Sequence, residues 1–289
     1  AMSNFPDRYD GFHTYNRCCR SSQDKGRSKE NLKSYTKDRR AYEYWCDGNI
    51  HAANQFMGSN FFKGTSADHI GPISLGFVHD PRYLQPMPTN DNSTKRNRLL
   101  YEDVVKIIET NNRTDVYPMS WFSREIWEYI KENFENNKDK ISTIYRDALK
   151  QNMANFMYVL YYILENCHDS GKDFLTSALL EPNYHYFKYS YQFDEKGNIV
   201  STDDRHFTDR NAHELERYKR IAIESVYDYN DKNNRHSTPY LSDDKTKLLD
   251  KICSDILSQI YTPSITKEYI LTSLNELMIK VQNRLISEL

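Results

Sequence analysis

A polar stretch at residues 67–98 holds side chains whose types and spacing suit phosphodiester hydrolysis. Asp68 and His69 are adjacent, and Asn92 follows near the end of the stretch. An Asp carboxylate and an Asn carbonyl are hard oxygen ligands of the kind that Mg²⁺ prefers. An imidazole held off the metal can take the proton from an attacking water, and the metal can stabilise the scissile phosphate and the leaving oxygen. The stretch therefore contains the parts of a metal-dependent hydrolytic site.

Two short strands and a helix are needed to bring these side chains together. Adjacent strand residues point to opposite faces, so Asp68 and His69 can serve one site only where the strand ends, and Gly71 makes a turn there plausible. Residues 82–87 (RYLQPM) predict a second extended segment, and a helix is expected to begin near Asn92. This order of elements would place Asp68, His69 and Asn92 in one small space.

Helical periodicity dominates the rest of the chain. The clearest helix lies at 266–287, where Thr266 can cap the first turn and one apolar stripe follows. Residues 184–201 alternate aromatic and polar side chains, which predicts a β-hairpin. We interpret its aromatic residues as strand packing rather than as a platform for nucleotide bases. The other expected helices lie near 30–45, 101–111, 120–135, 140–166, 211–228 and 244–260.

Composition indicates a globular protein, and the mixture of elements indicates an α+β fold. Hydrophobic residues make up 38% and charged residues 28% of the 289 residues, and 23 Tyr and 13 Phe supply apolar area for a core. No run approaches the roughly 18 apolar residues that a membrane span needs, and no secretory pattern is present. We therefore expect a cytoplasmic protein without membrane contact. The polar stretch would belong to residues 1–115, and residues 116–289 would form a mainly helical region packed against it.

The formal net charge of −2 hides a basic N-terminal flank. Residues 1–40 carry ten Lys or Arg against five Asp or Glu, and Lys95, Arg96 and Arg98 form a second basic cluster. Such patches can meet phosphate even on a nearly neutral protein, because the local field matters more than the total charge. A solvated surface explains most of these residues, whereas Arg96 and Arg98 favour phosphate contact.

Cysteine usage predicts neither a disulfide framework nor a structural zinc site. The five Cys are an odd number and form no CxxC pair. Most are expected to be reduced thiols in the core. Cys18 and Cys19 stand between Arg17 and Arg20 and are expected to pack or to lie near a nucleic acid.

Three motifs of the polar stretch resemble the HNH, or ββα-metal, nuclease motif in order and spacing. They are Asp68-His69-Ile70, Leu84-Gln85-Pro86-Met87 and Asn92-Ser93-Thr94-Lys95. The resemblance implies a small ββα-metal motif embedded in a mainly helical domain with one additional β-hairpin. It also implies that His69 is the general base, that Asp68 and Asn92 bind Mg²⁺, for which Mn²⁺ can substitute, and that Lys95 contacts phosphate.

Two points of the motif stay open. Asn90 and Asp91 are neighbouring candidates for the second metal ligand, because loop length varies in such motifs. The position before Leu-Gln is usually an Asn that steadies the base, and here it is Tyr83. A backbone carbonyl or His79 could orient His69 instead, and a loop without a role is an equal alternative for His79.

The flanks extend the resemblance. Residues 26–45 and 67–87 are similar to the Alw26I/Eco31I/Esp3I family of type IIS restriction endonucleases. The family implies Mg²⁺-dependent cleavage of double-stranded DNA at a fixed offset outside a short asymmetric site, with a possible dimer during cleavage. In that family the HNH site lies well inside a longer chain, whereas only 67 residues precede Asp68 here. The chain is therefore expected to be a catalytic C-terminal portion or a short relative.

Two other functions fit part of the same pattern. A DNA-binding module could retain the HNH scaffold after losing its chemistry, and Tyr83 is the direct hint of that loss. The intact set of Asp68, His69 and Asn92 argues against it, because a binding module does not need them. A nicking or defence nuclease would keep the chemistry on another polynucleotide, and neither fold nor metal separates it from a restriction enzyme.

Overall fold

The computed structural model describes residues 41–205, 209–231 and 237–289, and most of these residues are helical. The predicted α+β fold is confirmed, since two small antiparallel hairpins accompany the helices. The helices are α3 (Ala41–Trp45), α4 (Ile50–Met57), α5 (Thr89–Lys95), α6 (Tyr101–Asn111), α7 (Arg124–Asn133), α8 (Arg146–Leu175), α9 (Glu181–Tyr184), α10 (Asp209–Asp231), α11 (Asp243–Ser258) and α12 (Lys267–Ser287), and the strands are β1 (Ser66–His69), β2 (Leu84–Met87), β3 (Tyr189–Phe193) and β4 (Ile199–Asp204).

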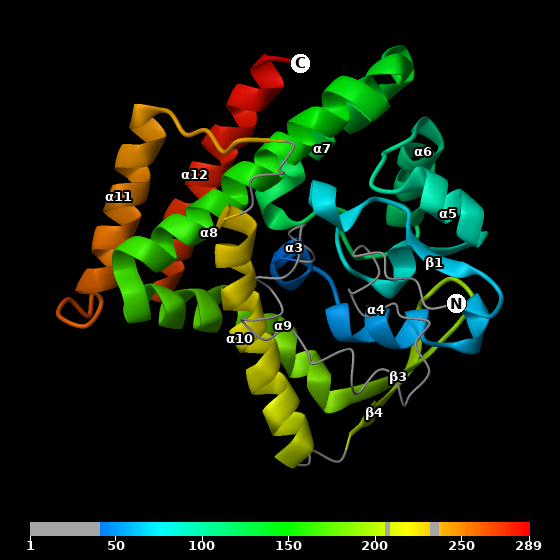
Figure 1. The fold of residues 1–289 in the computed structure, drawn as a ribbon, viewed down its shortest axis with the longest axis horizontal. Coiled ribbons are helices and arrows are strands. Elements are labelled where there is room, and N and C mark those ends of the chain that lie inside the picture. Colours follow the sequence, from blue (N-terminus) through cyan, green and yellow to red (C-terminus); the bar gives the residue numbers. More distant parts are fainter. Residues whose placement is uncertain (1–40, 206–208, 232–236) are drawn as a thin grey trace.

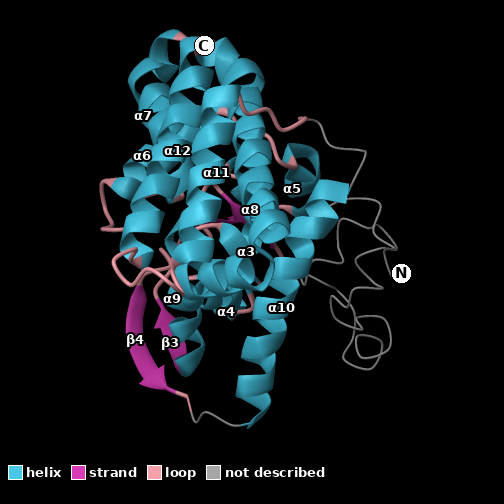
Figure 2. Cartoon of the chain, turned by 90° about the vertical axis from the view of Figure 1, so that its left-hand side faces the viewer, coloured by secondary structure: helices cyan, strands magenta, loops and turns pink. Residues whose placement is uncertain are grey.

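The long helix α8 organises the helical part of the molecule, packing against α10, α11 and α12 (Figure 1). The β3–β4 hairpin lies at the end opposite the C-terminus (Figure 2). The helices predicted from 101 onward are all present, and the expected end at 166 lies two residues before His168, where non-helical backbone angles divide α8 into two helical parts, the second ending at Leu175. The predicted helix near 30–45 is described only at its end, as α3, while Cys18, Cys19 and the basic flank lie outside the described residues.

Helix α12 has both features that its sequence predicts, an N-terminal cap and a buried apolar stripe. The Thr266 hydroxyl accepts a hydrogen bond from the Tyr269 backbone N–H at 3.2 Å, which satisfies a donor of the first turn. The apolar stripe then faces α8 and α11, because its residues recur at helical spacing. The fully or almost fully buried members of the stripe are Ile270, Leu274, Leu277, Met278 and Val281.

Two main clusters of buried side chains stabilise the described residues. One joins α3, α8, α10, α11 and α12. The other packs Ile70 and Phe77, from the chain between β1 and β2, against Trp127 of α7 and Leu149 of α8. The second cluster therefore joins residues on both sides of position 115, and the division into 1–115 and 116–289 stays a prediction.

The predicted β-hairpin at 184–201 is present as β3 and β4, shifted toward the C-terminus. Its aromatic side chains pack inward, as expected: Phe193 lies against Phe56 of α4, with ring centroids 4.9 Å apart. Gln55 of α4 also binds the backbone of β3 at Tyr189 and Tyr191. The hairpin thus braces α4.

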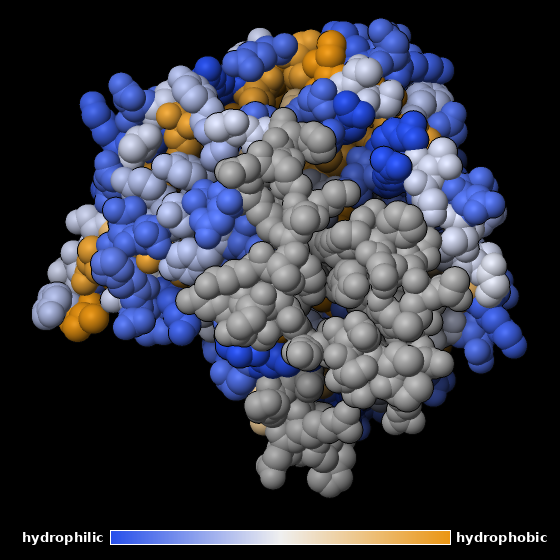
Figure 3. All heavy atoms as spheres, viewed as in Figure 1, coloured by the Kyte–Doolittle hydropathy of each residue, from blue (hydrophilic) through white to orange (hydrophobic). Residues whose placement is uncertain are grey.

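Outside the grey residues, the face seen in Figure 3 is mostly hydrophilic, with apolar residues at its top edge and at the tip where α11 turns into α12. Ile260 and Tyr261 in that turn are 73% and 85% exposed. Among the described helices, none is long and apolar enough to cross a membrane.

Candidate functional site

Asp68, Gln85 and Lys95 of the polar stretch meet in the corner formed by β1, β2 and α5, and His69 ends β1 beside them. β1 and β2 pair antiparallel, with Asp68 opposite Gln85 and His69 opposite Leu84. The helix begins at Thr89, one turn earlier than expected, so Asn92 lies in its middle and Lys95 in its last turn. The strand–strand–helix order therefore brings β1 and α5 into contact.

Asp68 is buried and its carboxylate is firmly held. Oδ2 accepts hydrogen bonds from Lys95 Nζ at 2.7 Å and from Gln85 Nε2 at 2.9 Å. Within the described residues, the hydrogen bonds to this carboxylate all fall on Oδ2. The second oxygen, Oδ1, is therefore the one that the arrangement leaves for a ligand.

Lys95 lies inside the protein. Its ammonium group also donates to the carbonyls of His69 and Ile70, both at 3.1 Å, and forms an ion pair with Asp103 Oδ1 at 3.0 Å. These contacts tie the last turn of α5 to the end of β1. Lys95 thus fixes the segment that carries Asp68 and His69.

Asp103, on α6, is a member of this cluster that the sequence interpretation missed. Its Oδ2 accepts the Leu100 backbone N–H at 3.0 Å and so caps the first turn of α6. Burial raises the pKa of the Asp103 carboxyl, and the neighbouring Lys95 ammonium opposes that rise. An acidic residue in the first turn of a helix is common, so nothing in the sequence distinguished Asp103 from an ordinary cap.

His69 is held by another histidine. Its Nε2 lies 2.7 Å from Nδ1 of His79, and the two rings are tilted by 43°. His79 is fully buried in the segment between the two strands, where its backbone N–H donates to the Asp47 carbonyl at 2.9 Å. The sequence had left His79 open between a contact to the base and a loop without a role, and its position favours the contact.

Tyr83 lies immediately before β2 and is hydrogen-bonded through both its side chain and its backbone. Its hydroxyl donates to the Val116 carbonyl at 2.6 Å, and burial raises the pKa of this phenol. Its backbone carbonyl accepts the Ile70 N–H at 3.0 Å, which ties the residue before β2 to the residue after β1. Tyr83 therefore anchors the corner through its backbone and its bond to Val116.

The remaining predicted residues lie on α5 and just after it. Asn92 is half-buried, whereas Asn90 and Asp91 are exposed. Arg96 and Arg98 are exposed as well, and the Arg98 guanidinium bonds the carbonyls at the end of α5. A further cation of α6, Lys106, is exposed and donates to Gln85 Oε1 at 2.9 Å, which links the surface to the Asp68 cluster.

The donor set of this corner suits a hard cation. No group of three or more His, Cys, Asp and Glu that could hold a metal ion occurs among the described residues. Asp68 Oδ1 is a carboxylate oxygen that accepts neither of the hydrogen bonds made to Oδ2, and Asn92, half-buried on the neighbouring α5, carries a side-chain carbonyl, so water and substrate oxygens would fill the other positions around a cation here. That pattern fits Mg²⁺, which keeps several waters and binds phosphate.

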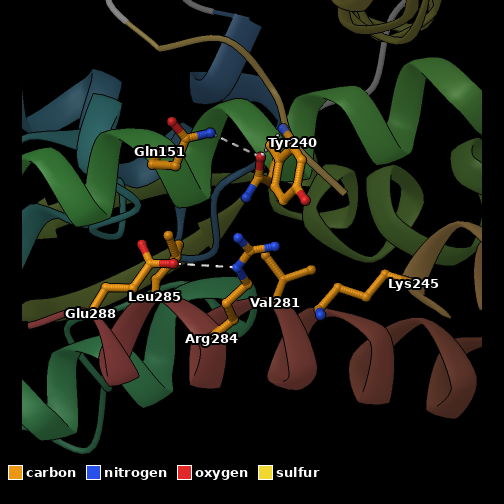
Figure 4. A pocket seen from close by; sticks show the side chains of 8 residues that line it. Gln151, Tyr240, Lys245, Val281, Arg284, Leu285 and Glu288 are labelled. Carbon is orange, nitrogen blue, oxygen red and sulfur yellow. Dashed lines mark hydrogen bonds and ion pairs between the residues drawn. The ribbon is translucent and has the colours of Figure 1, made fainter. Parts of the chain in front are cut away.

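A cavity of about 190 Å³ lies in the helical part, between α8, α11 and α12 (Figure 4). Over it the Arg284 guanidinium stacks on Tyr240, 4.4 Å from the ring centroid, and binds Glu288 at 3.3 Å. None of the predicted site residues lines this cavity. Its lining consists of Gln151, Asn155, Tyr240, Lys245, Val281, Arg284, Leu285 and Glu288.

A known protein family matches almost the whole chain. The sequence model of a family described as Type II restriction endonuclease (RE_Alw26IDE) matches residues 1–284. No curated protein and no solved structure matches the chain. The family match covers both the corner of β1, β2 and α5 and the helical part that surrounds α8.

Proposed function

Because this chain belongs to the type II restriction endonuclease family, whose members cleave DNA, we propose that the β1–β2–α5 corner is an HNH site that hydrolyses phosphodiester bonds of double-stranded DNA. One observation carries the proposal. Asp68 and His69 end the same strand, and each is held by its own partners: Lys95 and Gln85 for the carboxylate, His79 for the imidazole. A surface turn or an ordinary buried His would not need both arrangements.

In this proposal Asp68 Oδ1 and Asn92 hold the metal ion. Bound Mg²⁺ would stabilise the charge that develops on the scissile phosphate and on the leaving oxygen. The bonds from Lys95 and Gln85 to Oδ2 fix the plane of the Asp68 carboxylate, so that Oδ1 keeps one direction. Asn92, on α5, would contribute a neutral carbonyl, which leaves Asp68 as the charged ligand.

His69 is proposed as the general base. When its Nε2–H donates to Nδ1 of His79, the proton of His69 resides on Nε2 and its Nδ1 is in the basic form. Nδ1 can then accept the proton of the attacking water. His79 acts here as the positioning residue that the usual Asn would be, because Tyr83 is bound to Val116.

For Lys95 the geometry favours an internal role over the predicted phosphate contact. Its side chain is 4% exposed and bonds two carboxylates and two carbonyls. We therefore assign the DNA phosphate contacts to the exposed Arg96 and Arg98 beyond α5. Replacing either with Ala is expected to reduce the salt dependence of DNA binding by about one charge.

The family resemblance makes a type IIS enzyme, which cuts at a fixed offset from its site, the proposed subtype. Cleavage of both strands by one HNH site per chain requires two chains or two successive cuts, and we propose a dimer during cleavage.

Incubation with supercoiled plasmid tests the proposal, in Mg²⁺ or in EDTA, beside His69→Ala. We expect discrete Mg²⁺-dependent fragments from the wild type and none from the variant, with DNA binding retained. Cleavage by His69→Ala at the wild-type rate would contradict the assignment of the base. DNA binding without any cleavage by the wild type would instead favour the inactive scaffold, and slow nicking at many positions would argue against a sequence-specific enzyme.

A further inference from the structure

Lys95 is shared by two carboxylates that belong to different elements. Its Nζ lies 2.7 Å from Oδ2 of Asp68 on β1 and 3.0 Å from Oδ1 of Asp103 on α6. The side chains of Lys95, Asp68 and Asp103 are 4%, 7% and 5% exposed, so water screens their charges little. The three groups therefore form one buried ionic cluster rather than a surface ion pair.

The cluster holds two negative charges and one positive charge. If Asp68 and Lys95 were alone, their charges would cancel, and a divalent cation arriving at Oδ1 would meet a neutral pair. With Asp103 present, the ammonium is divided between two carboxylates and the cluster keeps a net negative charge. We propose that Asp103 is a positioning residue that, through Lys95, preserves the negative charge with which Asp68 binds the catalytic metal ion.

The two carboxylate oxygens of Asp103 bind different partners. Oδ2 caps α6 through the Leu100 N–H, and Oδ1 faces Lys95. The cap uses only Oδ2, so it leaves Oδ1 and its share of the carboxylate charge to Lys95. The nearby cation Lys106 is exposed and reaches Asp68 only through the neutral Gln85. Its charge therefore adds little to that of the buried cluster.

The inference rests on the proposed HNH site, and a direct binding measurement separates the two. Mn²⁺ binding without DNA is measured by electron paramagnetic resonance for the wild type, Asp68→Asn and Asp103→Asn. Glu102→Gln is the matched control, because it removes an exposed charge from the same turn of α6. Asp103→Asn keeps an acceptor for the Leu100 N–H, and Asp103→Ser replaces it if circular dichroism shows that the Asn variant is unfolded.

We expect Asp103→Asn to weaken Mn²⁺ binding by about tenfold, because one negative charge near the cation is lost. Glu102→Gln should bind Mn²⁺ like the wild type. In cleavage assays the Mg²⁺ concentration at half-maximal rate should rise in Asp103→Asn, while kcat at saturating Mg²⁺ stays within about twofold, since the reacting groups are unchanged.

The outcomes are distinguishable. Unchanged Mn²⁺ binding by Asp103→Asn, together with lost binding by Asp68→Asn, would overturn the role of Asp103 and leave the HNH site standing. Equal weakening by Glu102→Gln would also overturn it, because the effect would then not pass through Lys95. Unchanged binding by Asp68→Asn would contradict the metal site itself.

Discussion

The β1–β2–α5 corner and the cavity beside α12 both contain charged side chains, but these are buried in the corner and exposed at the cavity. In the corner, Lys95, Asp68 and Asp103 are each less than a tenth exposed and bind one another. At the cavity, Arg284 and Glu288 are 41% and 59% exposed and form a surface pair. Burying charge costs free energy unless the partners compensate it, so a cluster like that of the corner is stable only as a complete set.

This difference identifies where function is expected. A surface pair can be lost with little consequence, because water replaces each partner. The buried cluster instead gives each atom a fixed place, including Oδ1 of Asp68, which is what a metal ligand requires. A cavity alone is therefore a weaker indication of chemistry in this molecule than an ordered set of buried charges.

The largest expected effect is on stability. Lys95→Met leaves Asp68 and Asp103 buried without their cation, so we expect the free energy of unfolding to fall by about 3–5 kcal/mol. Arg284→Met removes the cation beside the cavity and should change the unfolding midpoint far less. Urea denaturation of both variants beside the wild type measures the contrast, and equal losses would remove the distinction between the two regions.

The next effect concerns the base. His79→Ala should lower kcat by about tenfold to a hundredfold, because His69 then loses the partner that fixes its ring and tautomer. His79→Asn keeps an acceptor near Nε2 of His69 and should recover part of that loss. A pH–rate profile of each variant tests this, and identical profiles and rates would show that His79 does not orient His69.

A smaller effect is expected for Gln85. Gln85→Leu removes the donor to Asp68 Oδ2, and we expect a loss of about 1 kcal/mol in stability and a several-fold higher Mg²⁺ requirement. Lys106→Met is the matched control, because it removes the surface cation and leaves the bond between Gln85 and Asp68 intact. If both variants require more Mg²⁺ to the same extent, the cation rather than the Gln85 donor matters.

Much of the helical part could be predicted from its sequence. The α12 stripe and the Thr266 cap are local patterns, and periodicity alone gave the helix. The end predicted at 166 lies two residues before His168, whose φ of 49° marks a kink that divides α8 into two helical parts. The second part, which ends at Leu175, was not predicted, because it resumes beyond a break in the helical pattern.

The corner was predictable in its members but not in its bonds. The motif identified Asp68, His69, Asn92 and Lys95 by order and spacing. It did not show that Lys95 turns inward, because that depends on Asp103, which follows in a different helix. The partner of His69 was open for the same reason: only the loop between the strands brings His79 within 2.7 Å.

The smallest effect belongs to the helical part and is confined to alkaline pH. Tyr162 on α8 donates to Asp250 of α11 at 2.5 Å, and this bond, with burial, raises the pKa of Tyr162 to about 12. Because the folded-state pKa lies above that of the unfolded chain, about 10, this stabilisation is complete below pH 10 and is lost as pH rises toward 12. Tyr162→Phe should therefore show a shallower loss of stability than the wild type in denaturant titrations between those pH values. Cleavage near neutral pH should be unchanged, which separates this exposed pair from the buried cluster that holds Asp68.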